Sequence, residues 1–236
     1  MDWKTQIFAY CERGTNTAFW AEPLNAVSNF AFIGAAFLAL QLWNVKRSVR
    51  DGAIELGLIG IVFAVGVGSF LFHTFATKWA MLADTMPISM FMVAYLSYAV
   101  RRFVAVTWFA TGLSVVFFLL AAAAVETISC DGARCLNGSL GYVPAWAALM
   151  IIGGALQASD HPAAKSLLTA AAIFGVSLIF RSVDLLVCAG TLIQPGWRAG
   201  THAIWHVLNA TVLYLLLRAA VRYGLKNAYS NRNSEN

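Results

Sequence analysis

Two histidines near the C-terminal end of the sequence have the spacing of a metal-binding pair. His202 and His206 stand four residues apart in the stretch GTHAIWHVLNA, so on a helix they share one face and lie one turn apart. Two imidazoles in this arrangement can hold one metal ion, as they do in zinc enzymes. The spacing therefore predicts a metal site on the last long apolar segment.

Further polar groups interrupt the apolar stretch GSFLFHTFATKWAMLAD, residues 68–84. Ser69 and His73 are also four residues apart, and Asp84 follows after a short connection. Ionisable side chains inside apolar segments are costly and usually face a bundle interior or a water-filled cavity. We predict that His73 joins the two later histidines around one ion, with Asp84 and Ser69 beside it.

The chemistry of three imidazoles favours zinc. Three protein ligands with an open fourth position are typical of a catalytic zinc site, although iron and copper also accept three imidazoles. The fourth histidine, His161, lies in ASDHPAAK without such companions and is expected to be an ordinary loop residue. Arg181 and Asp184 stand three residues apart in an apolar segment, and we expect them to form an ion pair.

The segments that must position these side chains are apolar enough to cross a membrane. The 236-residue chain is 60% hydrophobic and 11% charged, whereas soluble domains are about 25% charged. A spanning helix needs roughly 20 mostly apolar residues. Seven stretches qualify, at about residues 24–43, 53–76, 81–100, 103–125, 140–157, 163–188 and 200–220. We expect an all-α, polytopic membrane protein with one seven-transmembrane domain over residues 1–223 and a polar cytoplasmic tail over 224–236.

Basic residues are concentrated on one side of these spans. They are Lys46, Arg47, Arg50, Arg101, Arg102, Lys165, Arg218, Arg222, Lys226 and Arg232. By the positive-inside rule, the N-terminus lies outside and the C-terminus is cytoplasmic. In this orientation Ser69, Asp84 and three of the four histidines lie at the outer ends of their spans. These histidines are His73, His202 and His206. The opening MDWKTQIFAYCERG has no apolar signal-peptide core, so we expect it to be retained.

All four cysteines fall on the outer side of this topology, where an oxidising compartment permits disulfides. Cys130 and Cys135 could pair within one loop, which would leave Cys11 for Cys188. Some of them could instead remain free thiols. Spacing alone does not settle the connectivity.

Several separated motifs resemble those of the alkaline ceramidases and the wider CREST superfamily of seven-helix metal hydrolases. Ser69-x-x-Phe72-His73 followed by Asp84-x-x-Pro87 resembles the first signature, and HAIWH matches the H-x-x-x-H signature of the last helix. YCERGTNTAFWAEPLNAVSN and FRSVDLLVC resemble the N-terminal and sixth-helix segments of the same family. Because no long soluble domain is evident, we expect a bacterial-type member in the inner membrane, with its site toward the periplasm.

The resemblance implies a zinc ion held by the three histidines named above. It implies that Asp84 contacts the zinc-bound water and that Ser69 lines the same site. It also implies a disulfide between the N-terminal segment and the end of the sixth span, which here corresponds to Cys11 and Cys188.

A calcium site in the N-terminal segment is a further implication of the resemblance. Glu12 and Glu22 stand at matching positions, Tyr10 could offer its backbone carbonyl, and Asn16 could supply a side-chain oxygen. The match is incomplete, because Ala9 stands where an acidic residue is expected. Calcium prefers six to eight oxygen ligands, so a purely structural N-terminal cap is the alternative.

Together these features predict a zinc-dependent amide hydrolase that takes ceramide or a related N-acyl lipid from the bilayer and releases a fatty acid and a sphingoid base. Zinc on three imidazoles lowers the pKa of its water to about 7. Asp84 would act as general base and Ser69 would stabilise the developing oxyanion; Ser69 as nucleophile is the weaker alternative, because it lacks a free adjacent base. Thr85 and Met81 replace the usual Glu and Gln, which leaves substrate preference open.

Two other functions fit part of this pattern. The substrate could be an ester-linked acyl lipid. The progestin and adipoQ receptors are seven-helix proteins that share the zinc ligands, but they place the N-terminus in the cytosol, opposite to the charge pattern here. A transporter is disfavoured because neither repeats nor broken helices are evident. We expect no nucleic-acid partner and no obligate protein partner.

Overall fold

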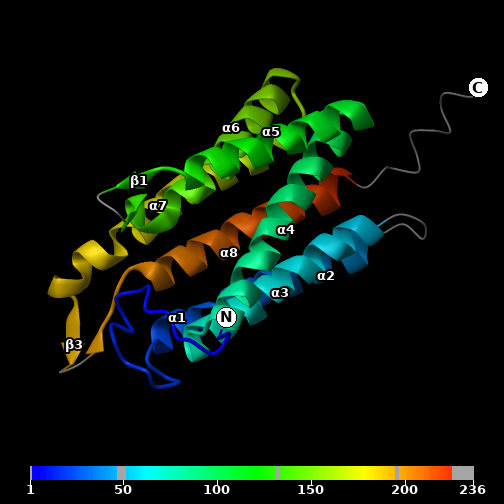
Figure 1. The fold of residues 1–236 in the computed structure, drawn as a ribbon. Coiled ribbons are helices and arrows are strands. Elements are labelled where there is room, and N and C mark those ends of the chain that lie inside the picture. The colour runs from blue at the N-terminus through cyan, green and yellow to red at the C-terminus, as the bar shows by residue number, and fades with distance from the viewer. Residues whose placement is uncertain (1, 47–51, 131–132, 195–196, 225–236) are drawn as a thin grey trace, which may run out of the picture.

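Long helices make up nearly all of the described chain, which comprises residues 2–46, 52–130, 133–194 and 197–224 of a computed structural model (Figure 1). Arg47, Arg50 and the tail from residue 225 onward, including Lys226 and Arg232, lie outside the described residues. Seven helical spans are long and apolar enough to cross a membrane. The prediction of an all-α, seven-transmembrane protein is therefore confirmed.

The helices follow the predicted spans with shifted ends. They are α1 (Pro23–Ser28), α2 (Phe30–Lys46), α3 (Ala53–Phe75), α4 (Lys78–Arg102), α5 (Trp108–Glu126), η1 (Cys135–Tyr142), α6 (Val143–Ala158), α7 (Ala164–Val187), η2 (Cys188–Gly190), α8 (His202–Ala219) and η3 (Ala220–Gly224). The first predicted span consists of α1 and α2 with a break at Asn29, and η1 with α6 forms the fifth.

Local sequence explains several of these ends. Pro23 opens α1, where its missing N–H costs nothing. The hydroxyl of Thr107 accepts a hydrogen bond from the backbone N–H of Ala110 and caps α5. α3 ends at Phe75, and its C-cap Ala76 adopts the left-handed conformation, so that only Ala76 and Thr77 separate α3 from α4. This turn is shorter than predicted.

α3 and α4 approach each other closely at Gly68. A Cβ atom at this position would collide with the backbone carbonyl of Ala83 on α4. The absence of a side chain therefore brings Ser69 and Asp84, the next residues on the two helices, to the same level of the bundle.

Two disulfides lie at one end of the bundle. Cys11–Cys188 joins the N-terminal segment to the end of α7. Cys130–Cys135 closes the short hairpin of β1 (Ser129–Cys130) and β2 (Ala133–Arg134). Both expected pairings are confirmed. A second hairpin, β3 (Leu192–Gln194) with β4 (Trp197–Arg198), leads into α8.

The N-terminal segment lies over the turn between α3 and α4, at the same end of the bundle as the start of α8 (Figure 1). The N–H of Ile7 donates to the carbonyl of Ala76 at 2.6 Å, and the N–H of Lys78 donates to that of Thr5 at 3.1 Å. These bonds bring the residues around Cys11 close to the end of α3, where His73 lies.

Apolar side chains from α2, α3, α7 and α8 form the centre of the bundle, including Phe32, Val62, Leu167 and Leu217. α5 instead exposes most of its apolar surface, as an outer helix in contact with lipid would. Most of the buried polar side chains, among them Glu12, Arg13, Glu22 and Asp184, lie at the end that carries the N-terminal segment.

Candidate metal centre

Three histidines from two helices converge at the end of the bundle that carries the N-terminal segment. His73 lies in the last turn of α3, whereas His202 and His206 lie in the first two turns of α8. Their potential ligand nitrogens all lie within 4.8 Å of one another. All three side chains are fully buried. The predicted convergence of these three residues is present in the fold.

Each imidazole has one nitrogen without a protein partner. These atoms are Nε2 of His73, Nδ1 of His202 and Nε2 of His206. An unsatisfied buried polar atom costs about 1–3 kcal/mol, and three of them in one place fit a metal ion that supplies the missing partner. The described residues therefore fit the metal ion that the resemblance implies.

Hydrogen bonds to the opposite ring nitrogens orient two of these ligands. Nδ1 of His73 lies 2.6 Å from Oε2 of Glu22, and Nδ1 of His206 lies 2.7 Å from Oγ of Ser28. A proton on Nδ1 donated to these oxygens leaves Nε2 free to bind metal. Such second partners fix the tautomer and the ring orientation of metal-binding histidines.

The third ligand, His202, is held by its backbone and by ring stacking. Its ring stacks on that of Tyr10 at a centroid distance of 3.8 Å and on that of Trp205 at 5.1 Å. The backbone N–H of His202 donates to Oδ1 of Asp184, and the backbone N–H of Cys11 donates to Oδ2 of the same carboxylate, both at 3.0 Å. Asp184 thus joins the N-terminal segment to the start of α8.

The expected ion pair between Arg181 and Asp184 is wrong. In the described part of the chain, the ion pairs within 4.0 Å are Arg13–Glu22 and His73–Glu22. Asp184 instead binds two backbone N–H groups. A spacing of three residues allows two side chains to meet on a helix, but it does not exclude a better partner on another segment.

Asp84 and Ser69 lie beside the histidines, as predicted. Ser69 on α3 and Asp84 on α4 directly follow the close contact between Gly68 and Ala83, which brings the two helices together at this level. Oδ1 of Asp84 is buried without a partner, and Asp84 is not part of the group of mutually close ligand atoms.

The guanidinium group of Arg181 faces three aromatic rings around the histidines. Its Cζ atom lies 5.3 Å from the ring centroid of Tyr142, 5.5 Å from that of Trp205 and 6.0 Å from that of Tyr10. Nε and Nη1 are buried without a hydrogen-bond partner. A positive charge with free donors therefore stands close to the candidate metal centre.

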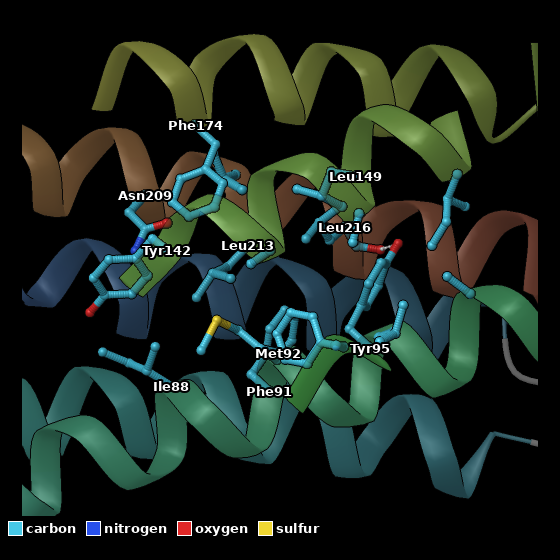
Figure 2. Close-up of a pocket in the computed structure, with 17 residues that line it drawn as sticks. Ile88, Phe91, Met92, Tyr95, Tyr142, Leu149, Phe174, Asn209, Leu213 and Leu216 are labelled. Atoms are coloured by element: carbon cyan, nitrogen blue, oxygen red, sulfur yellow. Dashed lines mark hydrogen bonds between the residues drawn. The ribbon is translucent and has the colours of Figure 1, made fainter. Parts of the chain in front are cut away.

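An apolar cavity of about 70 Å³ reaches Asn209, which lies one helical turn after His206 on α8 (Figure 2). Asn209 and Tyr142 line one end, and Tyr95 and Leu216 line the other. The distance from Asn209 to Leu216 along α8 is roughly 10 Å. Between them the walls are almost entirely apolar, contributed by α4, α6, α7 and α8.

The four residues expected to bind calcium already have protein partners. Glu12 accepts the N–H groups of Leu24 and Asn25 at the start of α1. Oδ1 of Asn16 accepts the N–H of Ala18, and the carbonyl of Tyr10 accepts that of Gly14.

Glu22 pairs with Arg13 and His73. Because the Arg13 guanidinium takes one oxygen of Glu22 and His73 takes the other, this carboxylate does not fit a calcium ion as it lies.

Electrostatics favours the charged form of Glu22. Burial alone would raise the pKa of this carboxyl group, but attraction to His73 and hydrogen bonds from His73, Asn25 and Arg13 outweigh it and lower the pKa below its ordinary value. Glu22 is therefore a carboxylate acceptor. Burial raises the pKa of the Tyr10 hydroxyl, although the Arg181 charge opposes this, so Tyr10 stays neutral.

The hydrogen bonds of Ser28, Glu22 and Asp184 and the ring contacts of Arg181 described above were not predicted from the sequence. The signal was present as polar or charged residues at the ends of apolar spans, where such groups usually serve a site. Their individual partners come from other helices and depend on the fold.

The model of the Ceramidase family matches residues 4–234, a range that includes every residue of the metal centre. No curated protein sequence matches the chain. The family match agrees with the resemblance carried by the histidine motifs, and the three histidines occupy one site in the structure. This chain belongs to the ceramidase family.

Proposed function

We propose that this protein is a zinc-dependent lipid amide hydrolase that cleaves ceramide or a related N-acyl lipid into a fatty acid and an amine. The observation that carries the proposal is the group of three buried imidazole nitrogens without protein partners, with the free Oδ1 of Asp84 nearby. Membership of the ceramidase family supports amide hydrolysis.

Zinc is the proposed metal because it binds neutral imidazole and keeps an open position in three-ligand sites. Bound there, it would acidify a coordinated water and polarise the substrate carbonyl. His73, His202 and His206 would hold it through the three unpartnered nitrogens.

Asp84 is proposed as the general base. Its Oδ1 is buried and free to accept a proton from the attacking water, while Ser69 lies beside the same carboxyl group. The protonated Asp84 would then give this proton to the leaving nitrogen, so that the amine departs neutral. A carboxylate at this position can serve both steps without leaving the site.

Two donors are available for the negative charge that develops on the carbonyl oxygen. The hydroxyl of Ser69 is one. The free Nε and Nη1 groups of Arg181 are the other, and they carry a full positive charge held between aromatic rings. Donors fixed before the reaction stabilise such charge without reorganisation.

The apolar cavity is proposed to receive the acyl chain. Asn209, one turn after His206 on α8, lines it, and its walls are almost wholly apolar side chains (Figure 2). An acyl chain seated there would bring its amide carbonyl toward the histidines. Lipids of the surrounding bilayer carry acyl chains that could be seated in this way.

The site is proposed to face the periplasm of a bacterial inner membrane, with the N-terminus outside. Both disulfides lie at the end of the bundle that carries the histidines, and disulfides persist in oxidising compartments. The excess of basic residues at the opposite ends of the spans supports the same orientation, because such residues are enriched on the cytoplasmic side.

The test is a lipid panel presented to the purified protein in nanodiscs. Ceramides, other N-acyl lipids and matched O-acyl lipids are incubated with wild type, with chelated protein and with chelated protein resupplied with zinc, and released fatty acid is measured by mass spectrometry. We expect zinc-dependent release from N-acyl lipids. Release from O-acyl lipids alone would reassign the substrate to esters, and release that survives removal of all metal would refute the metal mechanism.

A further inference from the structure

The side chain of Arg13 is the buried cation of the N-terminal segment. Its side chain has no exposed surface, and all five of its N–H donors are directed at oxygen atoms. Nε donates to Oε1 of Glu22 at 2.5 Å. The four remaining bonds, between 3.0 and 3.2 Å, go to backbone carbonyls of Asn16, Ala18, His73 and Thr74. Five donors is the full capacity of a guanidinium group.

These five oxygens come from three separate parts of the site. Asn16 and Ala18 belong to the N-terminal loop, and Glu22 precedes α1. His73 and Thr74 lie in the last turn of α3, where helix carbonyls lack partners within the helix and carry partial negative charge. One side chain therefore ties the loop to the end of the helix that carries a metal ligand.

Arg13 acts on His73 in two ways, once directly and once through Glu22. Its Nη2 group donates to the backbone carbonyl of His73. Through Glu22, which lies 2.6 Å from Nδ1 of His73, it also influences the ring of the same residue. Backbone and ring of His73 are thus held by one connected set of contacts.

A cage of one carboxylate and several carbonyl oxygens is the kind of donor set that calcium prefers. Here the guanidinium group of Arg13 occupies its centre. We propose that Arg13 acts as an internal cation in place of calcium, so that assembly of the N-terminal segment and positioning of His73 do not require the ion. This inference rests on the contacts of Arg13 and stands whatever lipid the protein cleaves.

The experiment compares the melting temperature and zinc affinity of full-length variants with and without added calcium. Wild type is expected to melt at the same temperature with excess CaCl₂ or with EGTA. Arg13→Ala leaves one carboxylate and four carbonyls without a cation, so we expect a fall of roughly 10 °C. Its zinc affinity is expected to fall 10–100-fold, as when an outer partner of a ligand is lost.

Rescue tests whether the position is a cation site. Either CaCl₂ or guanidinium ion, well below denaturing concentrations, is expected to raise the melting temperature of Arg13→Ala but not that of wild type. Arg13→Lys keeps the charge with fewer donors and is expected to lie between the two. Arg222→Ala removes an exposed arginine at the far end of the bundle and should leave both measurements unchanged.

The inference fails if calcium raises the melting temperature of wild type. It also fails if Arg13→Ala keeps the melting temperature and zinc affinity of wild type, or if neither cation stabilises that variant. Should Arg13→Ala not fold, the calcium response of wild type and of Arg13→Lys decides the question. None of these readouts depends on lipid hydrolysis, so their failure is distinct from failure of the proposed activity.

Discussion

Oγ of Ser28 lies 2.7 Å from Nδ1 of His206. Ser28 is the last residue of α1, directly before the break at Asn29, whereas His206 lies on the last span. The first and last spans therefore meet at a hydrogen bond that leaves Nε2 of His206 for metal. This contact gives the break in the first span a structural role.

Ser28→Ala is expected to weaken zinc binding 10–100-fold, because the ring of His206 loses the partner that fixes its tautomer. Zinc affinity is measured by competition with a chromophoric chelator. Ser89→Ala is the matched control, since the hydroxyl of Ser89 bonds only to its own helix in the described contacts and is exposed. Equal zinc affinity in the two variants would remove Ser28 from the site.

His206→Ala is expected to lose both bound metal and activity. Only His73 and His202 of the three converging imidazoles remain, one fewer than the three protein ligands of a catalytic zinc site. Metal content is measured by elemental analysis of purified protein. His161→Ala serves as control, because His161 accepts the N–H of Ala163 in the turn before α7 and lies far from the metal centre. Full metal content in His206→Ala would contradict the ligand assignment.

Asp84→Asn is expected to keep its metal and lose 10²–10⁴-fold in kcat, the usual range for removal of a general base. The amide is similar in size to the carboxyl group but does not accept the proton of water. Turnover and zinc content are measured on the same preparation. An active Asp84→Asn protein would show that another group takes the proton.

Gly68→Ala is expected to destabilise the protein by about 1–3 kcal/mol, the cost of overpacking, because the new Cβ collides with the Ala83 carbonyl. Separation of α3 from α4 also moves Ser69 away from Asp84, so activity should fall as well. Gly60→Ala lies on the same helix with open space around its Cβ position. Thermal unfolding of both variants checks this, and equal melting temperatures would argue against the close approach.

The parts of the site that could be predicted from sequence are those encoded by local spacing. His202 and His206 lie on one helix, so their separation of four positions suffices to place both on one face. The orientation of the spans then brought His73 to the same depth. The side of the membrane shared by the four cysteines made disulfides plausible, but the pairing of Cys11 with Cys188 was implied only by the family resemblance.

The parts that could not be predicted depend on contacts between distant segments. Glu22 was expected to bind calcium, but Arg13, nine residues earlier in the chain, forms an ion pair with it. Asp184 was expected to pair with Arg181 on its own helix, but the N–H groups of Cys11 and His202 reach it from two other segments. Backbone donors carry no sequence signature, so a pattern of side chains does not reveal them.

The spacing of the three ligands along the chain has a consequence for biosynthesis. One histidine lies at position 73, and the other two lie at 202 and 206 of 236 residues. A nascent chain therefore carries a single ligand until the ribosome has made more than four-fifths of the protein. The group of three histidines is therefore complete only after the start of the final span, His202–Gly224, has been made.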